Sequence, residues 1–157
     1  MIPYVVRMLG MVILLVALTA CGSTKVGKNA DGDSTLTITG NDGEKVTFTT
    51  GQEGKLPDGF PLPLIKGGKV GSATKITTNN KDGYSVELTY SGTHKEAADF
   101  YQKALKDLDI EVERTDVSAQ DEVTIMLMGQ SDKHDVWLMV NGKGEKGGTI
   151  AIMWGDK

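Results

Sequence analysis

The feature that most constrains the fold is an alternation of apolar and polar residues that recurs along most of the chain. It begins in residues 35–39 (TLTIT) and 45–50 (KVTFTT), where threonine alternates with larger apolar side chains. Successive side chains of a β-strand point to opposite faces, so a period of two predicts strands. The GNDG segment at 40–43 is typical of a tight hairpin turn. The sequence therefore predicts an N-terminal β-hairpin, whose apolar face must cover something because a lone hairpin is marginal in water.

The same alternation predicts a second hairpin and a run of later strands. The second hairpin comprises residues 69–78 and 84–90, around a turn at 79–83. Further strands are expected at 110–115, 122–129, 135–141 and 149–154. Their connections are short and turn-like, which favours antiparallel pairing of neighbouring strands.

One segment has a helical period instead. Its apolar residues recur at steps of three and four, which is typical of an amphipathic helix: Ala97, Phe100, Tyr101, Ala104, Leu105 and Leu108. Thr93 followed by Glu96 forms a capping-box pattern, so the helix is predicted over 94–108. The predicted fold class is α+β: an antiparallel sheet with one amphipathic helix on one face, preceded by the N-terminal β-hairpin.

Residues 56–68 contain three of the four prolines together with several large apolar residues. Proline fixes φ near −65° and biases its neighbour away from helix. We interpret this segment as an ordered structural strap rather than a proline-rich recognition motif.

One helix covers one face of a sheet, yet the C-terminal strands are apolar on both. The second face carries Met126, Met128, Trp137, Met139 and Met153. Two interpretations stay open. The N-terminal hairpin and the proline strap could cover this face as core, because large exposed patches are unusual in monomers. Alternatively, it is a groove for an apolar ligand or a partner protein, since methionine suits adaptable binding surfaces.

The N-terminus combines an apolar run with the lone cysteine. Residues 8–18 are apolar, and Thr19 and Ala20 are small residues directly before Cys21. The run has the length of a signal-peptide core and is short for a membrane span, which needs about 20 residues. The segment Leu18-Thr19-Ala20-Cys21 resembles the lipobox of bacterial lipoproteins.

That resemblance implies cleavage between Ala20 and Cys21 and a diacylglyceryl group on the cysteine thiol. Two acyl chains are sufficient for stable anchoring. The chain would then be exported and lipid-anchored to the bacterial cell envelope. Gly22, where an aspartate is absent, implies the outer membrane if the cell is Gram-negative.

The resulting domain division has three parts: residues 1–20 as lipoprotein signal peptide, 21–33 as lipidated cysteine and flexible tether, and 34–157 as a single α+β domain. The tether is expected from its Gly, Ser, Asn, Asp and Lys content. In addition, the proline-rich segment 56–70 and the later ADFYQKALKDL segment at 98–108 resemble small uncharacterised bacterial lipoproteins. This similarity implies a shared fold and not an activity.

Several other functions are disfavoured. The formal net charge is −4, and no basic stripe favours nucleic acid. Residues 142–147 match GxGxxG, but they precede a strand instead of opening a helix, so we expect a hairpin turn and not a nucleotide site. The acidic run at 29–33 lacks the closing glutamate of a calcium loop.

No cofactor or metal site is expected. His94 and His134 lack zinc-ligand spacing and are expected at the surface. The carboxylates at 107, 109, 121 and 122 are interpreted as solvated turn and helix-end residues. No catalytic residue is nominated, and the chain is expected not to be an enzyme.

Three functional hypotheses follow. The first is a non-catalytic envelope lipoprotein that is held at the membrane by acyl chains on Cys21 and binds a protein or envelope component through its sheet. The second is a carrier or sensor of a small apolar ligand held between the hairpin and the Met/Trp face. The third is an envelope hydrolase.

Overall fold

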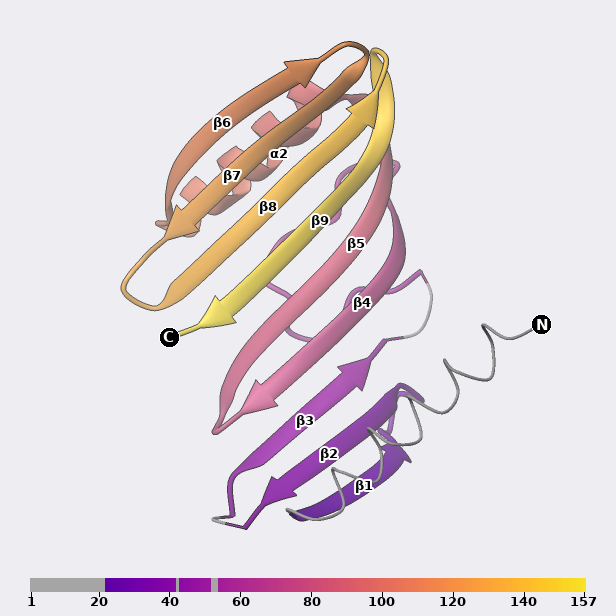
Figure 1. The fold of residues 1–157 in the computed structure, drawn as a ribbon, viewed down its shortest axis with the longest axis vertical. Helices are drawn as coiled ribbons and strands as arrows, with labels where there is room; N and C mark the ends of the chain where they lie inside the picture. The colour runs from indigo at the N-terminus through magenta and orange to yellow at the C-terminus, as the bar shows by residue number, and fades with distance from the viewer. Residues whose placement is uncertain (1–21, 42, 52–53) are drawn as a thin grey trace, which may run out of the picture.

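The computed structural model describes residues 22–41, 43–51 and 54–157, which form a large antiparallel sheet with one helix behind it (Figure 1). The fold is mainly β, and the predicted antiparallel sheet is confirmed. The strands lie side by side in the order β1-β2-β3-β4-β5-β9-β8-β7-β6. Their bounds in chain order are β1 (Gly22–Lys28), β2 (Ser34–Gly40), β3 (Lys45–Thr50), β4 (Lys69–Thr78), β5 (Lys81–Thr93), α2 (His94–Lys106), β6 (Glu111–Ala119), β7 (Glu122–Gln130), β8 (His134–Lys143) and β9 (Lys146–Asp156).

Residues 22–28 form the edge strand β1, so the expectation of a flexible tether is wrong there. Strand β1 pairs with β2 from Gly22 opposite Gly40 to Lys28 opposite Ser34. In the connecting turn, the Asn29 side-chain oxygen accepts hydrogen bonds from the backbone N–H groups of Asp31 and Asp33, at 3.1 and 2.8 Å. The polar composition that predicts a tether also suits an exposed edge strand, whose stability comes from backbone pairing.

The N-terminal hairpin extends the sheet instead of covering it. Strand β3 pairs with β4, which places Phe48 opposite Ile76, and Leu36 lies opposite Phe48 in turn. Paired residues share a face, so the apolar side of the hairpin continues the face that carries the methionines. The interpretation that the hairpin covers this second face is therefore wrong.

The helix α2 begins with the predicted capping box. Thr93 Oγ1 accepts from the Glu96 N–H at 3.2 Å, and the Thr93 N–H donates to a Glu96 carboxylate oxygen at 2.9 Å. The helix ends at Lys106, before the predicted residue 108. Its last turn is closed where the Ile110 N–H donates to the Leu105 carbonyl at 3.1 Å, and Asp109 adopts a positive φ of 57°.

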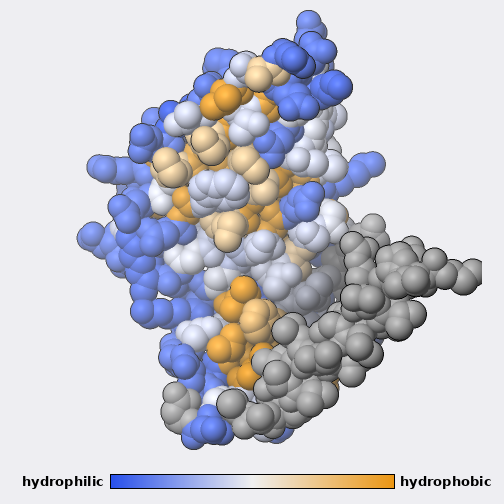
Figure 2. Space-filling view, in the orientation of Figure 1, coloured by the Kyte–Doolittle hydropathy of each residue, from blue (hydrophilic) through white to orange (hydrophobic). Residues whose placement is uncertain are grey.

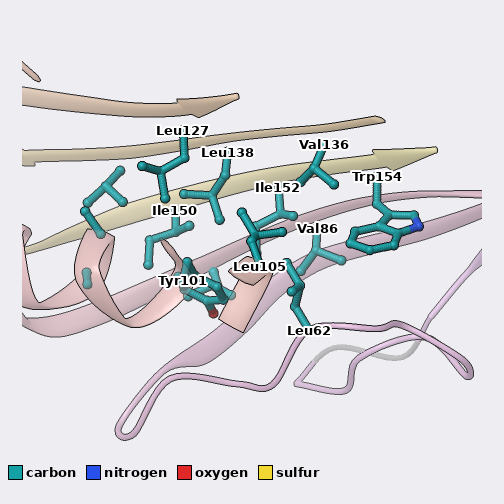
Figure 3. Packing of buried hydrophobic residues seen from close by; sticks show 14 of the residues in the cluster. Leu62, Val86, Tyr101, Leu105, Leu127, Val136, Leu138, Ile150, Ile152 and Trp154 are labelled. Carbon is teal, nitrogen blue, oxygen red and sulfur yellow. The ribbon is translucent and has the colours of Figure 1, made fainter. Parts of the chain in front are cut away.

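The core lies between α2 and one face of the sheet (Figure 3). The proline strap closes this side, because Leu62 is buried among the core residues and Leu56, Phe60 and Ile65 pack against them. The strap prediction is confirmed, but the strap covers the helix side and not the methionine side. Burial raises the pKa of Tyr101 in this core to about 12, although the nearby Ile65 backbone lowers it.

Candidate functional site: the open face of the sheet

We call the face opposite α2 the open face. In Figure 1 it faces the viewer, with α2 behind the sheet, and no other described helix or strand packs on it. Figure 2 shows apolar side chains gathered over two areas of this face. The lower area lies over β2 and β3 and the upper one over the C-terminal strands.

The strand register brings the predicted methionines and tryptophan together on the open face. Met128, Trp137 and Met153 lie opposite one another across β7, β8 and β9, and Met126 and Met139 form the neighbouring row. Met128 is 45% exposed and Met153 is 54% exposed, while the other three are half-buried. These side chains are therefore surface residues of the described chain and not core.

A groove of about 980 Å³ crosses the open face. Where Gly83 of β5 lies opposite Gly155 of β9, the floor of the groove is backbone alone, because neither residue carries a side chain. A Cβ placed at Gly155 would meet no heavy atom within 4 Å. The groove is lined by Ile76, Gly83, Tyr84, Ser85, Glu111, Val112, Glu113, Met128, Gly129, Gln130, Asp135, Val136, Trp137, Met153, Trp154 and Gly155.

Sequence reasoning missed the glycine floor. It assigned Gly83 to a turn at 79–83, whereas the turn consists of Asn79 and Asn80, with φ of 50° and 62°, and β5 begins at Lys81. Gly83 pairs with Gly155, which is far away in the chain. The residues around either glycine contain no pattern that predicts this pairing.

The groove is acidic as well as apolar. Its lining contains three carboxylates, Glu111, Glu113 and Asp135, and no lysine, arginine or histidine. Asp135 pairs with Lys157 at 3.1 Å, and this hydrogen bond lowers the pKa of its carboxyl group. Neither Glu111 nor Glu113 forms an ion pair within the described part of the chain.

A second, smaller hollow of about 350 Å³ lies on the helix side, between the strap and the ends of the strands. Lys75 pairs with Asp82 at 2.7 Å. The backbone N–H of Asp82 donates to Asp156 at 3.1 Å, and Asp156 also contacts His134 Nδ1 at 3.0 Å. Burial raises the pKa of Asp82, but hydrogen bonds from Lys75 and Thr77 outweigh it and lower that pKa overall. The carboxylates thus already accept hydrogen bonds from protein donors, and the network cross-links the strand ends.

The two histidines differ in their surroundings. His134 is partly exposed and packs on Trp154 with ring centroids 4.7 Å apart. His94 is only 6% exposed, so the expectation of a surface position is wrong. Its Nε2 lies 2.9 Å from the Gly144 carbonyl and its Nδ1 lies 2.5 Å from the Tyr90 hydroxyl. Since a carbonyl only accepts, the His94 Nε2–H donates to Gly144, and the contact of Nδ1 with the Tyr90 hydroxyl ties the ring to β5.

The remaining sequence candidates lie in turns and at the ends of helices and strands. The 142–147 glycines form the end of β8, a turn and the start of β9, as predicted. Asp121 and Glu122 lie at the β6–β7 turn, and Asp107 and Asp109 follow α2. Across the described residues, no cluster of three or more His, Cys, Asp or Glu side chains is arranged to hold a metal ion. Cys21 lies outside the described residues.

Within the described ranges, no helix has the length and apolarity needed to cross a membrane. Comparison of the chain with protein-family models, curated proteins and solved structures gives no match.

Proposed function

We propose that this chain is a lipid-anchored protein of the bacterial cell envelope with a non-catalytic binding role, and that the open face is its binding surface. The observation that carries the binding role is the groove, which no described helix or strand covers, with its half-exposed Met128 and Met153. Soluble monomers rarely expose large contiguous apolar patches unless these bind something. Methionine side chains are flexible and polarizable, so they adapt to a partner surface.

The anchoring proposal rests on the lipobox-like segment that ends at Cys21. Because β1 begins at Gly22, directly after this cysteine, acyl chains on Cys21 would hold the β1 edge of the sheet close to the bilayer. The Met/Trp groove lies over the strands at the other end of the sheet order, from β4 to β6. The groove would therefore be presented away from the anchored edge.

The anchor is tested with Cys21→Ala. Membrane fractionation and intact-mass measurement should show that the parent protein carries a diacylglyceryl cysteine at its N-terminus and sediments with membranes. The variant should lack the modification and the cleavage. An unmodified thiol on membrane-bound parent protein would contradict the anchor.

The binding surface is tested by placing a photo-crosslinking residue at position 128 and, as a matched control, at position 64. Leu64 is a 40% exposed apolar residue of the strap, outside the groove. In intact cells, we expect a discrete crosslinked product from position 128 and none from position 64. The same products from both positions, or none from either, would contradict a binding role for the open face.

The groove size favours one alternative, a carrier or sensor of a small apolar ligand. Small-molecule pockets are typically about 300–1,000 Å³, and the groove lies within that range. The ligand would lie in the groove itself, because the hairpin does not cover the face. An apolar dye should then shift the tryptophan emission, because Trp137 and Trp154 both line the groove, and Trp137→Phe should reduce the shift.

A further inference from the structure

We propose that the groove on the open face binds the apolar side of a cationic amphipathic helix from a partner protein. This inference rests on the proposed binding function and specifies the chemistry of the partner. Three observations carry it: the dimensions of the groove, its apolar floor, and the sign of its charge.

The dimensions match a helix lying across the strands. Most strands that line the groove contribute three consecutive residues, such as 83–85, 128–130 and 153–155, and the lining extends from β4 to β6. With a rise of about 3.3 Å per residue and a strand spacing of about 4.8 Å, the groove is about 10 Å wide and about 24 Å long. A helix is about 10–12 Å in diameter, and about 16 residues would extend over that length.

The floor suits the helix-in-groove mode of recognition, in which apolar side chains on one helix face enter an apolar groove. The bare backbone at Gly83 and Gly155 lets a helix approach the sheet closely. Met153 and Trp137 lie opposite each other on β9 and β8, in the row of side chains next to the two glycines. They offer adaptable and flat apolar surfaces for the helix side chains.

The charge decides what kind of helix fits. The lining has no cationic side chain, and Glu111 and Glu113 form no ion pair within the described residues, whereas Asp135 is paired with Lys157. The two glutamates therefore attract lysine and arginine and repel anions. Fatty acids, anionic lipid headgroups and acidic polymers are disfavoured for the same reason. Glu111 and Glu113 both lie on β6, at one end of the groove, so the basic residues of the partner helix should cluster at the end above β6.

The test uses the full chain in nanodiscs of zwitterionic lipid, with empty nanodiscs as the blank. Two 16-residue synthetic helices share one Leu/Met face, and their polar faces carry lysine in one peptide and glutamate in the other. Affinities are measured by calorimetry and by the intrinsic emission of Trp137 and Trp154, which both line the groove. We expect the lysine helix to bind at least tenfold more tightly than the glutamate helix, and the preference to weaken as salt is raised.

Variants assign the effect to the groove. Glu111→Gln with Glu113→Gln should reduce the lysine preference at least threefold, while Glu145→Gln in the β8–β9 turn should leave it unchanged. Equal affinity for both helices, an unchanged preference in the double variant, or displacement of the helix by oleate or anionic vesicles would overturn the proposal. So would a concentration-dependent dimer that buries Trp137 in place of the peptide.

Failure here is distinguishable from failure of the proposed function. If the lysine helix does not bind but position 128 still crosslinks in cells, the open face binds a partner of another chemistry. If both experiments fail, the binding role itself is wrong.

Discussion

At the scale of single residues, the position of the buried His94 ring depends on the absence of a side chain at Gly142. The His94 ring is held between the Tyr90 hydroxyl and the Gly144 carbonyl, which fixes the first turn of α2 against the β8–β9 hairpin. A Cβ at position 142 would lie 2.0 Å from His94 Cε1. The glycine is therefore required by the histidine, and not by a nucleotide phosphate.

Gly142→Ala should destabilise the fold, because the added methyl group displaces the His94 ring and breaks its two hydrogen bonds. Overpacking of this kind costs about 1–3 kcal/mol. Urea unfolding should show this loss, with Gly155→Ala as the control because a Cβ there meets no atom. Equal stability of the two variants would show that His94 is not confined as described.

At the scale of elements, the ends of β4, β5, β8 and β9 are joined by the polar network around Asp82 and Asp156. Lys75 and Thr77 come from β4, Asp82 from β5, and His134 from β8. These strands are brought together by pairing between β5 and β9, which are not consecutive in the chain. The network can therefore form only when strands far apart in the chain have paired correctly.

This network predicts acid sensitivity with a definite sign. The pKa of Asp82 in the folded protein is lower than in the unfolded chain, where the pKa of an aspartate is about 3.9. Its contribution to the free energy of unfolding is thus present above about pH 4 and is lost as pH falls through the folded pKa. Asp82→Asn should flatten the decline in stability below pH 4, measured by urea titrations across pH.

The control for that measurement is Asp132→Asn, in the β7–β8 turn, which contacts neither Lys75 nor Thr77. It should leave the slope of stability against pH close to that of the parent. A slope unchanged by Asp82→Asn as well would place the acid-sensitive contacts elsewhere.

At the scale of the whole molecule, one sheet has two unlike faces. The helix side is closed by α2 and the strap around residues such as Leu138 and Ile152, which are fully buried. On the open face, the alternate residues of the same strands include methionine and tryptophan, and no described helix or strand packs over them. A third layer, supplied by a partner, would complete a common arrangement of stacked secondary structure.

Substitution of aspartate on the two faces should separate binding from folding. Met153→Asp on the open face should change the free energy of unfolding by less than about 1 kcal/mol, because the side chain is half-exposed, and should abolish crosslinking from position 128. Leu138→Asp should unfold the protein, because it buries a charge without a partner. Circular dichroism and urea titration measure both, and unfolding by Met153→Asp would mean that the open face is core.

Local sequence alone determined the strands after residue 34, the capped helix, the hairpin turns and which residues alternate, because these depend on neighbouring side chains and turn chemistry. It also identified the five methionine and tryptophan residues of the open face as members of one surface. Only the tertiary structure decided that β3 pairs with β4, so that the hairpin widens the sheet instead of covering it. The strand formed by residues 22–28, the burial of His94 and the glycine floor likewise depend on partners distant in the chain. Pairing between segments far apart in the chain depends on backbone hydrogen bonds and on burial of side chains from both strands. Neither produces a periodic pattern in one segment that would identify its partner strand.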